Sequence, residues 1–132
     1  MAHELTGPFL ESIGRRALAE IQIKKLQLML APVLEGNGFY GRRLRAGGVA
    51  RPEDVASQED YRALPFTTKE DFSLDQAENP PYGTNLTFPR HAYTRIHQTS
   101  ATSGDPLSWL DTLASWTWWT RGRGAAYPAP GR

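Results

Sequence analysis

Cysteine is absent from this sequence of 132 residues. Its absence excludes disulfide bonds, thiolate metal ligands and thiol nucleophiles, and it agrees with a reducing compartment such as the cytoplasm. The histidines are few and dispersed, without the spacing of metal ligands, so we predict no metal site.

Long hydrophobic runs and a strong net charge are also missing. No stretch approaches the roughly 18 apolar residues of a membrane span, and the first ten residues, MAHELTGPFL, lack the basic start and apolar run of a secretory signal. A formal net charge of +1 offers no concentrated basic surface for nucleic acid. We therefore expect a cytoplasmic protein that binds neither membrane nor nucleic acid.

The spacing of apolar residues predicts a mostly helical N-terminal half. Apolar side chains recur at helical intervals from about Ser12 to Leu34, and Pro32 is expected to kink or end this longest helix. Shorter helices are predicted over residues 39–46, 57–64 and 69–77, the last two with hydroxyl caps and acidic first turns.

The helix over residues 39–46 is expected to end at Gly47 and Gly48. Its apolar side chains, Phe39, Tyr40 and Leu44, are then able to face inward. The three basic side chains of this segment are expected to lie mostly outward in solvent, with a phosphate or CoA contact as the alternative: Arg42, Arg43 and Arg45.

A strand, a loop and a return strand are predicted in the second half. The β-prone run Tyr93–Thr99 reads as the first strand and residues 107–110 as the second, after which Asp111 or Thr112 would cap a final helix. The expected fold class is therefore α+β, with the helical half followed by a strand-loop-strand.

The loop between the two predicted strands has the sequence TSATSGDP, residues 99–106. Small, hydroxylated and glycine residues let backbone N–H groups approach phosphate oxygens closely, and hydroxyls add further donors. The loop is not a Walker A motif, because the Gly-Lys-Ser/Thr ending is missing. Taken alone, such a loop is a weak signal, and an ordinary turn is its first interpretation.

Four ordered blocks of this sequence resemble the phenylacetate-CoA ligase branch of AMP-forming, adenylate-forming enzymes, which includes deazaflavin-coenzyme synthetase relatives. The third block, which contains the loop, is similar to the family pattern R-I-H-x-(S/T)-S-G-T-T-G-x-P. The blocks are LQLMLAPVLEGNGFYGRRLRAGGV, LPFTTKED, RIHQTSATSGDP and WLDT, and the resemblance as a whole covers roughly residues 15 to 120.

The resemblance implies that such enzymes activate a carboxylate with ATP and Mg²⁺ to an acyl-adenylate, and that many then form a CoA thioester. The loop would hold the ATP phosphates, with Ala101 standing where the family has its first loop glycine. No catalytic residue is assigned. The nucleotide-binding residues carried over by position are Thr99, Ser100, Ala101, Thr102, Ser103 and Gly104.

The resemblance also implies an incomplete enzyme. Residues 1–119 would form the N-terminal piece of a larger α/β ligase domain, whose adenine site, carboxylate pocket and catalytic lysine lie further along such enzymes. Residues 120–132 are rich in glycine, proline and arginine, and we expect a disordered tail or the product of a frameshift or early stop. We therefore expect the chain to be inactive alone.

Two other functions remain open. The long helix and the tryptophans could form a non-catalytic module that binds a partner chain, or the chain could be a small nucleotide-phosphate binder. Packing in a core or interface is the first interpretation of the tryptophans, and stacking on adenine or CoA is the second; rings left exposed would favour self-association. Structural or solvated roles are likewise expected for His97 and Lys69.

Overall fold

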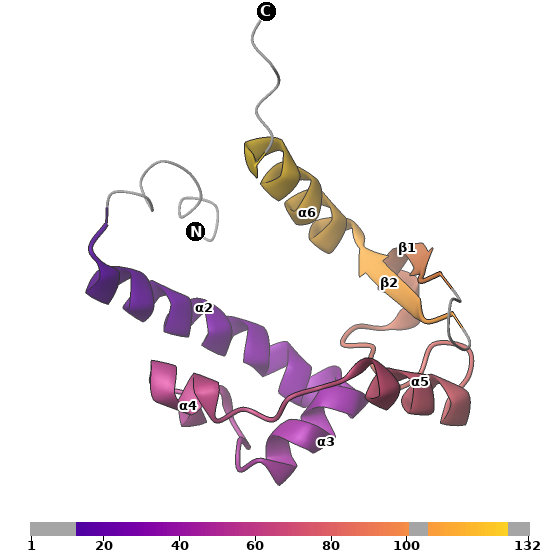
Figure 1. Cartoon of the computed structure of the whole chain (residues 1–132), viewed down its shortest axis with the longest axis horizontal. Helices are drawn as coiled ribbons and strands as arrows, with labels where there is room; N and C mark the ends of the chain where they lie inside the picture. Colours follow the sequence, from indigo (N-terminus) through magenta and orange to yellow (C-terminus); the bar gives the residue numbers. More distant parts are fainter. Residues whose placement is uncertain (1–12, 101–105, 127–132) are drawn as a thin grey trace, which may run out of the picture. The chain divides into compact units, whose positions relative to one another are not determined.

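The computed structural model describes residues 13–100 and 106–126, with residues 122–126 described by their backbone only (Figure 1). The chain divides into two compact units. The N-terminal unit comprises Met1–Glu35 and Tyr40–Phe66, and the C-terminal unit comprises Gly36–Phe39 and Thr67–Arg132. Each unit is described by itself below.

The longest helix, α2, spans Arg15–Gly36 and contains Pro32 in its interior. Of the two expected outcomes at Pro32, a kink or an end, the end does not occur there, because the break comes at Asn37. A proline removes one helical hydrogen bond, and burial of the neighbouring Leu30 and Leu34 stabilises the helix on both sides of it.

Helix α3 spans Gly38–Ala46, close to the predicted bounds. Gly48 follows it with a φ of 89°, a left-handed conformation that glycine adopts without steric cost, so the predicted glycine stop is confirmed. Phe39 and Leu44 are buried and Tyr40 is half-buried, as expected for inward-facing side chains.

Arg42 and Arg45 are exposed, as expected for outward side chains, and Arg43 is half-buried. Arg45 also has a structural contact that the sequence did not predict. Its guanidinium donates a hydrogen bond to the carbonyl oxygen of Leu34. The last carbonyls of a helix have no partner within the helix, and Arg45 satisfies one of those at the end of α2.

The core of the N-terminal unit is an aliphatic cluster that α2, α3 and the following turn build together. Val55, which follows the 3-10 helix η1 (Pro52–Asp54), is fully buried. Half-buried side chains, among them Tyr40 and Leu64, pack around the cluster. The buried members are Leu30, Leu34, Leu44, Val49 and Val55.

Two helices begin at the predicted hydroxyl caps. Helix α4 (Gln58–Arg62) starts after Ser57, whose hydroxyl accepts the Asp60 N–H. Helix α5 (Lys69–Glu78) starts after Thr68 in the same way. Helix α4 is shorter than predicted and ends before the residue preceding Pro65, where helical geometry is disfavoured.

The strands of the C-terminal unit form a two-stranded antiparallel ribbon. A 3-10 turn, η2 (Arg90–Ala92), leads into β1 (Tyr93–Gln98), which pairs with β2 (Ser108–Thr112) so that His97 lies opposite Trp109. The predicted strand-loop-strand is confirmed, with β2 beginning and ending slightly later than expected. The mostly helical first half and this ribbon together confirm the α+β class.

Helix α6 (Leu113–Ala126) follows β2 directly (Figure 1). The Thr112 hydroxyl accepts the N–H of Ser115, at an O···N distance of 3.1 Å, so one of the two predicted caps is used. The helix continues through part of the segment expected to be an irregular tail, because residues 113–127 contain no proline and each added residue gains a hydrogen bond.

Aromatic rings contact one another in the C-terminal unit. The rings of Phe39 and Phe72 stack with centroids 4.5 Å apart, and Phe72 meets Trp109 edge-on at 4.8 Å. The expected packing thus holds for Trp109. Trp118, in contrast, is 70% exposed on α6, so the core interpretation fails for this ring.

No helix within the described residues has both the length and the apolar content that a membrane span requires.

Candidate functional site

The candidate phosphate loop connects β1 to β2, and two hydrogen bonds between Thr99 and Leu107 join its ends; we call this pair of residues the closed base of the loop. The Thr99 N–H donates to the Leu107 carbonyl oxygen at 3.0 Å, and the Leu107 N–H donates to the Thr99 hydroxyl oxygen at 3.0 Å. These two bonds extend the pairing of the strands by one residue. They hold the two ends of the connection at a set spacing, which a backbone-lined anion site requires.

The structure places two of the six predicted nucleotide-binding residues. Thr99 is half-buried at the base, and its hydroxyl, although it accepts from Leu107, keeps a hydrogen that it can donate to an anion. Ser100 is exposed next to it. Four residues lie outside the described ranges, and the binding role of all six stays a prediction: Ala101, Thr102, Ser103 and Gly104 complete the set.

The sequence reasoning missed Gln76, a residue of α5 that contacts the first residue of β2. Its Nε2 donates to the carbonyl oxygen of Ser108 at 2.8 Å, and the Ser108 N–H donates to its Oε1 at 3.0 Å. Gln98 adds a contact to the Ser108 hydroxyl at 3.3 Å. No local signal marks a glutamine within a helix as the partner of a strand 32 residues away.

Asp75, the neighbour of Gln76, is a buried carboxylate with a structural partner. One carboxylate oxygen accepts the Thr84 N–H at 2.6 Å and the other accepts the Thr84 hydroxyl at 2.6 Å. Gly83 has a φ of 73°, and a Cβ there would collide with the Asp75 carboxylate. These contacts fix the turn after α5 and so give Asp75 a structural role.

His97 lies on β1 among polar and aromatic neighbours. Its Nε2 is 3.3 Å from an Asp111 carboxylate oxygen, and its ring stacks on Trp116 with centroids 5.2 Å apart. The Arg95 guanidinium lies 4.6 Å from the centre of the same Trp116 ring. The expectation of a packed, hydrogen-bonded histidine agrees with these contacts, although nearly half of its side chain is exposed.

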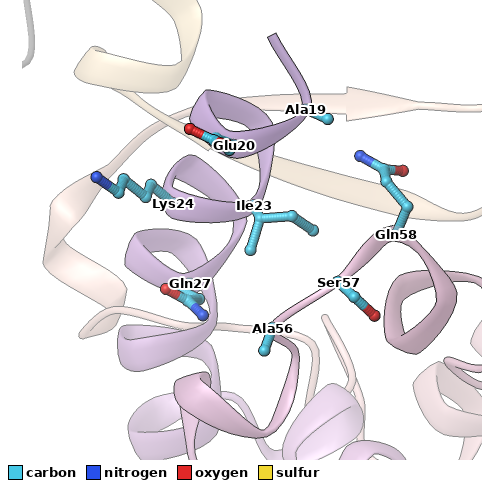
Figure 2. Close-up of a pocket in the computed structure, with 8 residues that line it drawn as sticks. All are labelled: Ala19, Glu20, Ile23, Lys24, Gln27, Ala56, Ser57 and Gln58. Atoms are coloured by element: carbon cyan, nitrogen blue, oxygen red, sulfur yellow. The ribbon is translucent and has the colours of Figure 1, made fainter. Parts of the chain in front are cut away.

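The N-terminal unit contains a cleft of about 420 Å³ between α2 and the start of α4. Figure 2 shows Ile23 pointing toward the space beside Ser57 and Gln58, while Lys24 extends away from it. None of the predicted nucleotide-binding residues lines this cleft. It therefore has no link to the phosphate-loop hypothesis.

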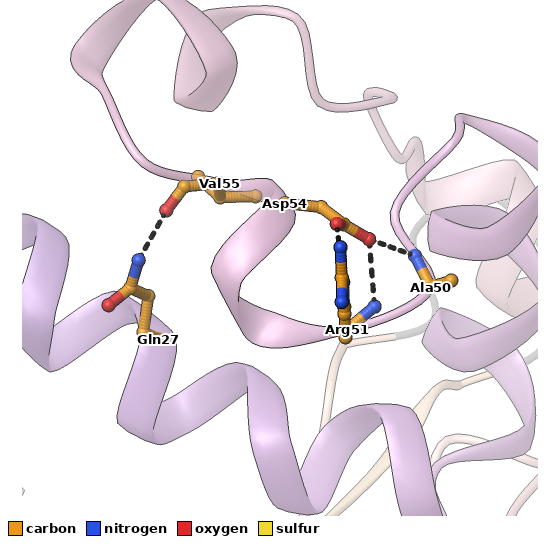
Figure 3. Close-up of polar contacts among 5 residues, drawn as sticks. All are labelled: Gln27, Ala50, Arg51, Asp54 and Val55. Carbon is orange, nitrogen blue, oxygen red and sulfur yellow. Dashed lines mark hydrogen bonds and ion pairs between the residues drawn. The ribbon is translucent and has the colours of Figure 1, made fainter.

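The polar contacts beside this cleft are structural (Figure 3). Gln27 of α2 donates to the Val55 carbonyl oxygen at 2.9 Å. Asp54 accepts the backbone N–H groups of Arg51 and Ala50, at 3.0 and 2.9 Å. The Arg51 backbone bond, followed by the Ala50 bond and the Arg51 side chain, lowers the pKa of Asp54.

A similar cap lowers the pKa of Asp60 in α4. The hydrogen bond from the Ser57 hydroxyl is the largest cause, and the Ala56 N–H adds to it. Hydrogen bonds to a carboxylate favour its charged form. Both lowered pKa values are thus explained by turns and helix caps and do not indicate acid or base chemistry.

Mg²⁺ would need a set of oxygen ligands such as carboxylates. Within residues 13–100 and 106–126, no three histidine or acidic side chains come together as possible metal ligands.

Curated phenylacetate-coenzyme A ligases are similar to this chain in sequence. The protein from Thermus thermophilus is 34% identical over 99 residues, which cover 75% of this chain and 21% of that protein. The protein from Pseudomonas putida is 31% identical over 97 residues, covering 74% and 21%. The protein from Aromatoleum evansii is 30% identical over 112 residues, covering 80% and 24%. No protein-family model matches the sequence.

Solved structures of 2-hydroxyisobutyryl-CoA ligase are similar in fold. An open conformation in complex with 2-HIB-AMP and CoA has a TM-score of 0.72 and 26% identity, covering 83% of this chain and 25% of that one. A complex in the thioesterification state has a TM-score of 0.73 and 27% identity, covering 83% and 23%. Both coverages are consistent with the expected N-terminal piece of a larger ligase. Over the matched stretch, this chain is a relative of the phenylacetate-CoA ligases, as its four residue blocks predicted, and it spans about a fifth to a quarter of their length.

Proposed function

We propose that this chain supplies the ATP-phosphate-binding part of a cytoplasmic AMP-forming acid-CoA ligase. The complete reaction activates a carboxylate with ATP to an acyl-adenylate and then forms a CoA thioester. The observation that supports this most is the closed base between Thr99 and Leu107, at the position of the family's phosphate loop. The similarity to ligases solved with an acyl-adenylate and CoA adds to it.

In this proposal the loop residues position the phosphates that leave as pyrophosphate. Thr99 holds the base of the loop and Ser100 presents a hydroxyl beside it, while the carried-over residues up to Gly104 add hydroxyls and backbone N–H groups. Fixed donors around the departing phosphates lower the barrier by orientation and by electrostatic stabilisation. Ala101 weakens the site if this position needs a positive φ, because a Cβ is unfavourable there.

We further propose that residues 1–119 form an incomplete ligase part and that this chain does not catalyse adenylation by itself. ATP–pyrophosphate exchange measures the first half-reaction directly. The purified chain is expected to show no exchange above the background without enzyme. Exchange by the chain alone, retained through repeated purification and lost when the loop is altered, would contradict this part of the proposal.

A chimera tests the positive part of the proposal. The matched stretch of the Thermus thermophilus ligase would be replaced by residues 15–120 of this chain, and exchange would be measured with its carboxylate substrate. We expect exchange to persist and Ala101→Gly to increase it. The matched control is Gly14→Ala, in a chimera that begins at residue 14 instead of residue 15. A folded chimera that exchanges no pyrophosphate with either residue at 101 would refute the phosphate-binding role.

The alternative, a non-catalytic interaction module, is favoured by one observation. Trp118 and Leu113 on α6 are 70% and 65% exposed, so this helix presents large apolar side chains that a partner could cover. Sedimentation velocity of wild type and Trp118→Ser would test it, since an interaction surface predicts self-association that the substitution abolishes. Two monodisperse monomers of equal mass would argue against this function.

A further inference from the structure

The amide of Gln76 bonds the backbone of β2 as a neighbouring strand would. It donates to the carbonyl oxygen of Ser108 and accepts the N–H of the same residue, at 2.8 and 3.0 Å. The described sheet has two strands, β1 and β2. At Ser108, therefore, a side chain from α5 takes the place of a third strand.

Ser108 is where β2 begins after the candidate loop. It pairs in register with Gln98, the last residue of β1, and its neighbour Leu107 makes both bonds that close the base with Thr99. Ser108 is buried and so is Leu107. The hydrogen bonds of Gln76 to Ser108 are thus one residue away from the two Thr99–Leu107 bonds that set the spacing of the strand ends.

Further contacts fix the position of helix α5, from which Gln76 extends. Phe72, one turn before Gln76, contacts Trp109 edge-on, so α5 contacts two successive residues of β2. Asp75 ties the following turn to the same helix through Thr84. Gln76 is therefore a side chain whose position is fixed before any ligand binds, which is the condition for preorganisation.

We propose that Gln76 is the positioning residue that fixes the spacing of the Thr99 and Leu107 strand ends, and so prepares the loop base for phosphate. The link to phosphate rests on the proposed function. The link to the strand ends does not, and it is measurable without a ligand. Gln76 acts through Ser108 and is not a catalytic residue.

Gln76→Glu provides a reversible test. A protonated glutamic acid can donate to the Ser108 carbonyl and accept its N–H, as glutamine does, whereas a carboxylate cannot donate and sets an anion against the carbonyl oxygen. Hydrogen-exchange protection of the Thr99 and Leu107 amides, corrected for intrinsic rates, is expected to fall about tenfold at neutral pH. It is expected to return to the wild-type value once the new carboxyl is protonated.

The matched control is Gln58→Glu, because the Gln58 side chain makes only an exposed contact with Gln22 in the N-terminal unit. It should leave protection at Thr99 unchanged at every pH. Gln76→Met keeps the length of the side chain and removes both hydrogen bonds, so its loss of protection should not reverse with pH. The proposal would be overturned if the Thr99 and Leu107 amides kept wild-type protection in both Gln76 variants at neutral pH. It would also be overturned if amides throughout the C-terminal unit lost protection to the same extent.

MgATP then separates this proposal from the proposed function. If the wild-type chain binds MgATP, Gln76→Glu should weaken the affinity about tenfold at neutral pH, relative to wild type at the same pH, and the ratio should return to one in acid. An unchanged ratio would overturn the link to phosphate. If wild type does not bind MgATP, the phosphate-binding role is contradicted for the chain alone. The hydrogen-exchange protection of Thr99 and Leu107 still decides whether Gln76 fixes the spacing of the strand ends.

Discussion

The two units of this chain use different interactions to hold their structure. In the N-terminal unit the buried side chains are aliphatic and form one cluster. In the C-terminal unit fewer apolar side chains are buried, and three buried polar residues accompany them: Asn37, Asp75 and Ser108.

This difference has a physical consequence. Apolar packing is not directional and tolerates small shifts, whereas buried hydrogen bonds fix distances and angles and are costly to leave unmade. The described buried side-chain polar atoms all have partners. The unit that contains the candidate loop is therefore the one whose geometry is set by directional bonds, among them those of Gln76 and Thr99.

The largest expected effect lies in the aliphatic core. Leu34→Ala removes a side chain that is 5% exposed at the centre of the cluster, and it should destabilise the N-terminal unit by about 3 kcal/mol. Hydrogen exchange of the Val49 amide, which is bonded to the Leu44 carbonyl, reports this unit. Leu28→Ala, at an exposed position of the same helix, is the control. Equal loss of protection at Thr99 would show that the two units unfold together.

A smaller effect is expected from the polar network. Asp75→Ala leaves the Thr84 N–H and hydroxyl without their carboxylate partner and should destabilise the C-terminal unit by about 2 kcal/mol. Glu78→Ala, at an exposed position of α5, is the matched control. Protection of the Thr99 amide should fall and that of Val49 should not. An unchanged Thr99 amide would contradict the importance of buried polar contacts in this unit.

Gly83→Ala should destabilise the same unit by about 1 kcal/mol, through the positive φ at this position. A shift of the Asp75 carboxylate away from the added methyl is expected to accompany it. Gly14→Ala, where a Cβ meets no other atom within 4 Å, is the control. Comparison of thermal midpoints would measure the difference, and equal midpoints would refute the proposed constraint.

The smallest effect concerns acid. Both Asp54 and Asp60 have a pKa lowered from 3.8 by hydrogen bonds to the folded backbone and side chains. Their contribution to stability is therefore complete above about pH 5 and is lost as pH falls through their lowered folded pKa values. In the double variant Asp54→Asn with Asp60→Asn, hydrogen-exchange protection of the Val49 amide should fall less than in wild type as the pH is lowered. An identical dependence would show that these caps contribute nothing measurable.

The helices and the strand-loop-strand could be predicted because their signals are local. Ser57 and Thr68 precede acidic first turns and do begin helices, and Gly48 does end one. A distant contact decides the outcome where the local signal leaves two open. Pro32 was expected to kink or end the helix, and it does not end α2, because the aliphatic cluster stabilises the helix around it.

The candidate site also has features that could be predicted from the sequence and contacts that could not. The hydroxyl-rich loop and its place after a β-prone run were readable from residues 93–106, and the ligase resemblance came from ordered blocks of the same sequence. The contacts that Gln76 makes with Ser108 were not readable, because a helical glutamine has many possible partners and its choice depends on how α5 packs on β2.

The sequence by itself thus determined the order of helices and strands, the loop and the family relationship, since caps, periodicity and motifs act over a few residues. Only the tertiary structure decided which side chains hold these elements together: an aliphatic cluster in one unit, and Asp75, Gln76 and Thr99 in the other. Burial and hydrogen-bond geometry arise when distant segments meet, and that information is not contained in any short stretch of the chain.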